Sequence, residues 1–260
     1  MDAFIKVHAA GNDFILVDGR KVDEISPEQI RFVCHRHMGI GADGLILVKP
    51  VDVATFQMEY FNADGNSANM CGNGARSAVA FAHYMNFFDG VRCTFLAGDG
   101  KHEGFIEKMQ FPFYEIRVNI FWQGNVIPVG KNAWFINTGV PHVVCKVDNV
   151  DEVDLPGQAL EYRFREDLAP GGVNVDFVDA KKGLRIRTYE RGVEEETLSC
   201  GTGVSAAALV AFQQGWVSRD KFSIETRGGN FEIEIGANSL WLKGPVTFIA
   251  SLHVFDFFKN

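Results

Sequence analysis

The stretch NMCGNGARSAVAFAHYM, residues 69–85, places one cysteine before two closely spaced glycines and a run of alanines and larger apolar residues. Gly72 and Gly74 allow the backbone to turn tightly and leave room for a ligand. The residues after them leave little polar face, so the sequence predicts a buried helix that begins beside Cys71. A thiol in that position is a packing residue, half of a disulfide, a metal ligand or a reactive group.

The same pattern returns once, as SCGTGVSAAALVAFQQG at residues 199–215, and Cys200 lies 129 positions after Cys71. This offset also aligns Tyr60 with Tyr189, and weaker matches such as FLAGDGK with ETRGGNF lie outside the block. A shared offset indicates an internal duplication. We therefore expect an N-terminal half over residues 1–125 and a C-terminal half over 126–260. The halves are expected to join near WQGNVIPVG (122–130), and the last strand is expected to pack back on the first half.

Each half also carries short β-rich runs, such as FIKVHA and DFILVD, and the run FEIEI alternates apolar and acidic residues. The stretch SPEQIRFVCHRH is typical of a helix start, with Ser26 as N-cap and Pro27 in the first turn. Alanine-rich helices let strands approach closely on every side. These patterns predict a mixed α/β (α+β) fold of two pseudo-symmetric halves. Each half is a barrel-like sheet around a central helix, and the active site is expected in the cleft between them.

The composition excludes several classes of protein. The chain has 260 residues and a net charge of −8 without a dense basic cluster, which argues against a nucleic-acid-binding surface. It has no apolar run long enough for a signal peptide or a membrane span, so we expect a cytoplasmic protein without a membrane partner. An odd number of widely spaced cysteines favours free thiols. No zinc-type spacing occurs, which predicts no metal site, and Cys34, Cys93 and Cys145 are interpreted as buried apolar residues.

Cys71 and Cys200 differ from the other cysteines because both precede a helix and both recur beside two glycines. The first N–H groups of a helix lack internal partners and carry partial positive charge. Such an end binds a carboxylate and lowers the pKa of an adjacent thiol. If the two halves face one another, one thiol can remove an α-proton while the other delivers a proton to the opposite face. A disulfide formed on oxidation is a further interpretation of the pair.

The motifs FNADGNSANMCGNGAR and YERGVEEETLSCGTG, together with KVHAAGNDF, resemble those of the diaminopimelate epimerase family. The resemblance runs from about residue 4 to about residue 245. It implies a small-molecule substrate and the conversion of LL- to meso-2,6-diaminopimelate in lysine and peptidoglycan precursor biosynthesis. It also implies catalysis by two cysteines without pyridoxal phosphate or another cofactor, and similar proteins are often homodimers.

The resemblance implies a role for individual residues of this chain. Cys71 and Cys200 correspond to the acid/base pair, and His142 and Glu190 to residues that tune the thiol pKa values. The positions that correspond to substrate contacts are Asn12, Asn62, Gly72, Asn73, Asn174, Glu190, Arg191, Gly201 and Thr202. Two features depart from the family pattern. Val140 stands where an asparagine is frequent, and Glu194, Glu195 and Glu196 form a longer segment, which we interpret as a solvated loop.

Two other functions stay open on the sequence. A related cofactor-independent racemase of the proline or hydroxyproline type would share the fold, but such proteins typically have a histidine in place of Asn73 and lack the E-R-G motif. A non-catalytic amino-acid-binding protein would need neither cysteine. Exchange of the α-proton of diaminopimelate, of proline, or of neither distinguishes the three.

Overall fold

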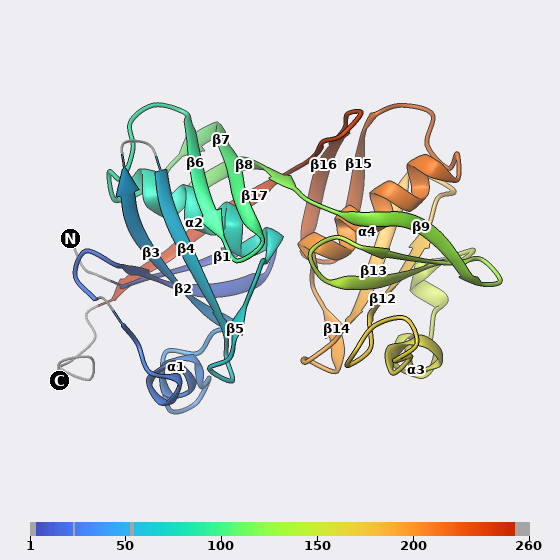
Figure 1. Cartoon of the computed structure of the whole chain (residues 1–260), viewed down its shortest axis with the longest axis horizontal. Helices are drawn as coiled ribbons and strands as arrows, with labels where there is room; N and C mark the ends of the chain where they lie inside the picture. Colours follow the sequence, from blue (N-terminus) through green and yellow to red (C-terminus); the bar gives the residue numbers. More distant parts are fainter. Residues whose placement is uncertain (1–3, 23, 53–54, 253–260) are drawn as a thin grey trace. The chain divides into compact units, whose positions relative to one another are not determined.

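The computed structural model describes residues 4–22, 24–52 and 55–252. The chain divides into two compact units, which Figure 1 shows coloured along the sequence. Unit 1 comprises Met1–Val118 and Pro245–Asn260, and unit 2 comprises Asn119–Gly244. Within the described ranges, every helix is too short or too polar to cross a membrane.

Unit 1 is a closed barrel of eight strands. Its hydrogen-bonded pairs run β1–β2–β3–β4–β6–β7–β8–β17 and return from β17 to β1, with β2–β3 and β4–β6 parallel. A short strand, β5, also pairs with β4. The strands are β1 (Phe4–Ala9), β2 (Asn12–Asp18), β3 (Gly44–Asp52), β4 (Thr55–Asn62), β5 (Ser67–Ala68), β6 (Arg92–Ala97), β7 (Gly100–Gln110), β8 (Phe113–Ile120) and the later part of β17 (Leu240–Leu252).

Helix α2 (Gly72–Tyr84) lies inside this barrel. All its residues from Gly72 to Ala82 are buried, and it packs against β1, β2, β3, β4 and β7. Small alanine side chains allow this close approach, while Phe81 and the strand residue Phe14 fill the remaining space without any solvent exposure. Burying each phenylalanine side chain contributes about 2–3 kcal/mol. The helix that the opening motif predicts is therefore confirmed, and Cys71 is its N-cap.

Unit 2 repeats the strand order of unit 1. Its pairs run β9–β10–β11–β12–β13–β15–β16–β17, and β11–β12 and β13–β15 are parallel like their counterparts in unit 1. Helix α4 (Gly201–Gln213) packs against β9–β13 and β16. The strands are β9 (Gln123–Gly130), β10 (Ala133–Asn137), β11 (Pro141–Lys146), β12 (Asn174–Asp179), β13 (Leu184–Glu190), β14 (Glu195–Thr197), β15 (Lys221–Thr226), β16 (Gly229–Ile235) and the first part of β17.

The predicted mixed α/β fold, a sheet around a central helix made twice, is confirmed by these two units. Three shorter helical elements lie outside the barrels. Helix α1 (Pro27–Cys34) begins with the predicted Ser26 cap, and the side chain of Gln29 completes a capping box. The other two are η1 (Val150–Glu152) and α3 (Leu155–Arg163), which packs against β12, β13 and β14.

The structure describes two segments that the sequence singles out. The units divide between Val118 and Asn119, close to the stretch 122–130 where the halves are expected to join, and Gln123–Gly130 is strand β9 of unit 2. The prediction of a solvated loop holds only in part for the three glutamates, since Glu194 lies in an exposed turn and Glu195 is exposed, but Glu196 is half-buried. Glu195 and Glu196 begin strand β14, the side chain of Glu196 is 17% exposed, and Glu194 forms an ion pair with Arg163.

Candidate functional site

Each of the two motif cysteines caps its helix with its sulfur. Cys71 Sγ accepts a hydrogen bond from the N–H of Gly74 at 3.3 Å, and Cys200 Sγ accepts one from the N–H of Gly203 at 3.4 Å. Both cysteines have extended backbone, as an N-cap residue requires. The two caps are therefore the same local structure formed in two separate units, and each places a thiol at a helix N-terminus.

In unit 1, the amide side chains of Asn73 and Asn12 form a directed chain of hydrogen bonds beside Cys71. Arg76 is fully buried on α2 and donates to Asn73 Oδ1 at 2.6 Å, so the amide nitrogen of Asn73 points the other way. That nitrogen donates to Asn12 Oδ1 at 3.2 Å, and Asn12 in turn donates to Asp43 at 2.7 Å. Asn12 Oδ1 therefore also faces Cys71 Sγ, at 3.9 Å.

Around this chain lies a group of paired charges. Asp13, next to Asn12, accepts hydrogen bonds from Arg36 and Lys6. Burial would raise the pKa of Asp13, but these hydrogen bonds outweigh it and lower the pKa to about 2. Arg36 also pairs with Asp43 at 2.6 Å. The charges fix the start of β2, which carries Asn12.

Asn62 ends strand β4 at the same edge of the barrel. It pairs across the sheet with Gly44, which pairs in turn with Phe14 two residues after Asn12. The Asn62 side chain accepts a hydrogen bond from the Tyr60 hydroxyl at 2.8 Å. The structure thus brings the predicted unit 1 residues Asn12, Asn73 and Cys71 together, and places Asn62 two strands away.

In unit 2, a chain of hydrogen bonds leads from Cys200 into the barrel. Cys200 Sγ lies 3.3 Å from Thr202 Oγ1, which lies 3.0 Å from His142 Nε2. His142 Nδ1 lies 2.7 Å from Asp176 Oδ2, and Asp176 Oδ1 accepts from the Thr188 hydroxyl at 2.7 Å. His142, Asp176 and Thr202 are buried. These contacts join three predicted site residues to two that the sequence analysis missed.

Asn174, Glu190 and Arg191 lie around this chain. The Asn174 amide nitrogen is 3.3 Å from His142 Nε2, and its oxygen accepts from the N–H of Arg191 at 2.7 Å. Arg191 Nη1 donates to the carbonyls of Pro170 and Gly172, so loop backbone engages the guanidinium that the sequence predicts as a carboxylate ligand. Glu190 accepts from Thr197 at 2.9 Å.

Burial is the largest influence on the pKa of the Cys200 thiol. Burial raises the pKa of this thiol well above its usual range, and the negative charges of Glu190 and Asp176 raise it further. The N–H of Gly203, which donates to the sulfur, lowers it, but by less. Burial and these charges thus oppose the lowering of the thiol pKa that a helix N-terminus favours.

The other cysteines behave as predicted. All five are free, and Cys34, Cys93 and Cys145 are buried. Burial raises the pKa of each of these three thiols to about 12, so they stay protonated at neutral pH. No group of three or more histidine, cysteine or carboxylate residues with the geometry of a metal site occurs in the described part of the chain.

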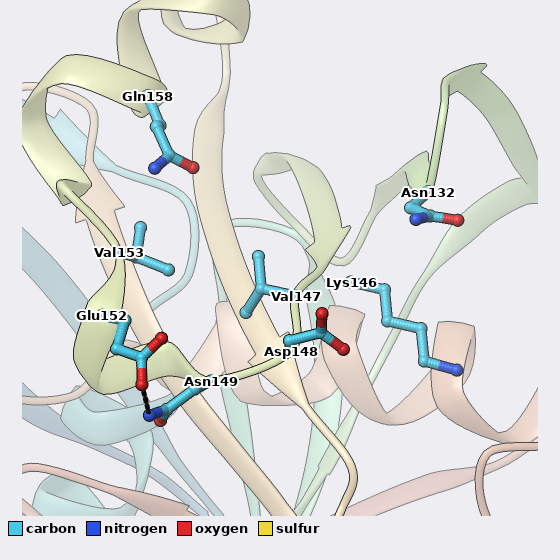
Figure 2. A pocket seen from close by; sticks show the side chains of 8 residues that line it. All are labelled: Asn132, Lys146, Val147, Asp148, Asn149, Glu152, Val153 and Gln158. Atoms are coloured by element: carbon cyan, nitrogen blue, oxygen red, sulfur yellow. Dashed lines mark hydrogen bonds between the residues drawn. The ribbon is translucent and has the colours of Figure 1, made fainter.

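A pocket of about 530 Å³ opens elsewhere on unit 2 (Figure 2). It is lined by Asn132, Lys146, Val147, Asp148, Asn149, Glu152, Val153 and Gln158. Figure 2 shows the hydrogen bond from Asn149 to Glu152 at its edge, 2.8 Å long. None of these residues belongs to the predicted site, and the pocket is a separate surface feature.

Comparison with known proteins decides the family. A family model described as diaminopimelate epimerase matches residues 4–110 and 134–249. The chain belongs to the diaminopimelate epimerase family. A diaminopimelate epimerase from Chlorobaculum tepidum is 38% identical over 248 residues, with 91% of this chain and 95% of the relative covered. One from Methanocella arvoryzae is 40% identical over 265 residues, covering 93% and 92%.

Solved structures share the fold of this diaminopimelate epimerase family member at low sequence identity. A predicted epimerase from Pseudomonas aeruginosa has a TM-score of 0.76 at 13% identity, covering 98% of this chain and 99% of the other. A probable proline racemase from Agrobacterium radiobacter has a TM-score of 0.70 at 12% identity, covering 99% and 94%. These similarities show the fold alone.

Proposed function

We propose that this protein is a diaminopimelate epimerase, an isomerase that converts LL- to meso-2,6-diaminopimelate without a cofactor. Of Cys71 and Cys200, one removes the α-proton of the substrate and the other delivers a proton to the opposite face. Family membership supports the reaction. The observation that carries the mechanism is the duplicated cap, in which each thiol accepts an N–H bond at a helix N-terminus. The mechanism requires the two thiols to meet opposite faces of one α-carbon when substrate is bound.

The helix ends supply the second part of the chemistry. Removal of the α-proton pushes negative charge into the neighbouring carboxylate, and the N–H groups and dipole of a helix N-terminus stabilise that charge. Gly72 and Asn73 begin α2, and Gly201 and Thr202 begin α4. These four residues are proposed to surround the reacting carboxylate, while Asn12, Asn62, Asn174, Glu190 and Arg191 hold the rest of the substrate.

His142 and Glu190 are proposed to set the protonation of Cys200. Glu190 acts by charge, since its carboxylate raises the pKa of the thiol. His142 acts through the Thr202 hydroxyl, which lies between its ring and the sulfur. The proposal includes a role in lysine and peptidoglycan precursor synthesis, a cytoplasmic location and a homodimer. Size-exclusion chromatography with light scattering tests the dimer.

The test is exchange of the α-proton of LL-diaminopimelate in deuterium oxide, followed by NMR, with chromatography of the stereoisomers. Wild-type protein is expected to exchange and epimerise without added pyridoxal phosphate. Cys71→Ala and Cys200→Ala are each expected to lose epimerisation by at least about 10²-fold, the usual contribution of a positioned acid or base. Cys93→Ala is the matched control, because this buried thiol lies in strand β6 outside the site.

Three results would overturn parts of the proposal. Retention of near wild-type activity in either cysteine variant would refute the two-thiol mechanism. Exchange with proline but not with diaminopimelate would identify a racemase of the proline type. Binding of diaminopimelate without exchange of its α-proton would identify a binding protein.

A further inference from the structure

Beneath the Cys200 cap, the hydrogen-bond partners of Asp176, His142 and Thr202 assign a direction to each bond between the carboxylate and the thiol. A carboxylate can only accept, so His142 carries its proton on Nδ1 and donates it to Asp176. A ring whose single proton is on Nδ1 accepts at Nε2. Asn174 supports this assignment independently. Its oxygen is occupied by the N–H of Arg191, so its amide nitrogen faces His142 Nε2.

The direction continues to the sulfur. Since His142 Nε2 accepts, the hydroxyl proton of Thr202 points to it, and a lone pair of Thr202 Oγ1 faces Cys200. The oxygen can then accept the proton of the thiol at 3.3 Å, and it cannot donate to a thiolate at the same time. The network therefore favours the S–H form of Cys200.

Unit 1 supplies an internal comparison, because the position there that is equivalent to Asp176 is apolar. A Cβ built on Gly74 would meet Ile46 Cδ1 at 3.1 Å, and one built on Gly203 would meet Asp176 Oδ1 at 2.5 Å. Ile46 and Asp176 thus lie beneath the same point of their helices. Ile46 is buried like Asp176, so the fold itself does not need a carboxylate there.

The strand register extends the comparison to the neighbouring positions. Ile46 pairs with Tyr60, and Asp176 pairs with Thr188. Phe14 pairs with Gly44, and His142 pairs with Asn174. Tyr60 therefore corresponds in position to Thr188, one residue away from the Tyr60–Tyr189 match of the sequence. Strands β2–β4 of unit 1 place Phe14, Ile46 and Tyr60 where β11–β13 of unit 2 place His142, Asp176 and Thr188.

We propose that Asp176 is a positioning residue that keeps Cys200 protonated by fixing the direction of the hydrogen bonds through His142 and Thr202. A buried carboxylate costs free energy, and the apolar counterpart in unit 1 avoids that cost. Asp176 is nevertheless fully buried and held by two bonds of 2.7 Å. The two thiols, alike in their caps, are thereby made inequivalent, with Cys200 as the proton donor of the resting enzyme.

For the reaction, this inference rests on the proposed function. A substrate whose α-proton faces Cys71 would lose that proton to Cys71, while Cys200 delivers its own proton to the opposite face. Cys200 is then a thiolate, which the network disfavours, until it is reprotonated. The charged and titratable groups that bear on Cys200 and on Asp176 are Glu190 on β13, His142 and Cys145 on β11, and Asp176 itself on β12.

The experiment measures alkylation of each cysteine by iodoacetamide, with mass spectrometry of the peptides, across a range of pH. Only the thiolate reacts, so the rate follows the thiolate fraction. In Asp176→Asn, alkylation of Cys200 at pH 7.5 is expected to be about tenfold faster, which corresponds to a downward shift of one pKa unit. Alkylation of Cys71 is expected to be unchanged, since unit 1 has Ile46 and no carboxylate at the position that corresponds to Asp176. This readout does not depend on substrate.

A double-mutant cycle separates the hydrogen-bond network from simple charge repulsion. If Asp176 acts through the network, Asp176→Asn has its tenfold effect with Thr202 present and less than about a threefold effect in a Thr202→Val background. An equal effect in both backgrounds would mean that the carboxylate acts only by its charge, and would overturn the inference. Equal acceleration of Cys71 and Cys200 would mean a general loosening of the fold, and would also overturn it.

Thr202→Val alone provides a second test if Asp176→Asn does not fold. If Thr202 accepts the S–H proton, its removal destabilises the thiol form, and alkylation of Cys200 should be faster. If Thr202 instead donates to a thiolate, its removal would make alkylation slower and refute the assignment. In the epimerisation assay, Asp176→Asn is expected to move the basic limb of the kcat/KM profile to lower pH by about one unit. If wild-type protein does not epimerise, the proposed function fails, and the alkylation result still decides the role of Asp176.

Discussion

Substitution of Gly203 by alanine tests how closely α4 approaches the carboxylate beneath it. The added Cβ would lie 2.5 Å from Asp176 Oδ1 and 3.2 Å from Thr188 Oγ1, so the buried carboxylate must move by about 1 Å to restore an ordinary contact of about 3.5 Å. That displacement disrupts the two bonds to Asp176, from His142 and from Thr188, each 2.7 Å long. Hydrogen bonds to a charged group contribute about 1.5–3 kcal/mol each.

The expected net effect is a loss of about 3 kcal/mol in the free energy of unfolding. Loss of the two bonds destabilises the protein by roughly 3–6 kcal/mol, and the higher helix propensity of alanine offsets up to about 1 kcal/mol of this loss. At about 2–4 °C per kcal/mol, the Tm should fall by roughly 6–12 °C. Thermal unfolding followed by circular dichroism measures this shift, and urea denaturation gives the free energy directly.

Gly74→Ala is the matched control in unit 1. Its Cβ would meet Ile46 Cδ1 at 3.1 Å, the end of a flexible side chain that can give way. We expect a change below about 1 kcal/mol, because helix propensity offsets the tight contact. If Gly203→Ala were as stable as wild type, or if both alanine variants lost the same amount, the difference between the two caps would not lie in the carboxylate.

Three further predictions concern other parts of the chain. The pKa of Asp13 is lowered to about 2, so this carboxylate contributes about 2 kcal/mol to the free energy of unfolding above pH 4 and loses that contribution between pH 4 and 2. In Asp13→Asn, the free energy of unfolding should therefore change less with pH over that range. Ser26→Ala removes the N-cap of α1 and should lower the free energy of unfolding, measured by urea denaturation, by about 1 kcal/mol. Ser26→Thr keeps a capping hydroxyl and should retain most of that stability. Cys93 and Cys145, whose pKa values burial raises to about 12, should stay unmodified by iodoacetamide at pH 8 in native protein, and mass spectrometry after quenching would reveal any labelling.

The sequence predicts helices α1, α2 and α4 and many of the strands because their signals are local. The glycines after Cys71 and Cys200, the alanine-rich runs and the Ser26 cap each act within a few residues of chain. The duplication makes the fold predictable as well, since one architecture has to satisfy both halves. Strand β9 is less evident from the sequence because it contains Gly124 and Pro128, which are typical of turns, although Pro128 lies in a strand paired with β10.

The partners of the site residues were less predictable because they depend on register between distant strands. His142 meets Asp176 because β11 and β12 are parallel neighbours, and α3 lies in the chain between these two strands. Nothing local to His142 specifies that register. A weaker signal was present in the run VNVDFV, where an aspartate interrupts apolar residues in a strand buried on both faces. A charged residue in such a strand indicates a specific partner.

Strand β17 gives the order in which the two units can be completed during synthesis. Its first residues pair with β16 in unit 2, and the residues from Thr247 to Leu252 pair with β1 in unit 1. Unit 2 is one continuous segment, whereas the unit 1 barrel needs a strand translated after all of unit 2. The N-terminal unit is therefore finished second. Until then β1 and β8 are unpaired strand edges on the nascent chain, and such edges can pair with other chains and aggregate. Rapid synthesis of β17, or a chaperone that covers these edges, would prevent this.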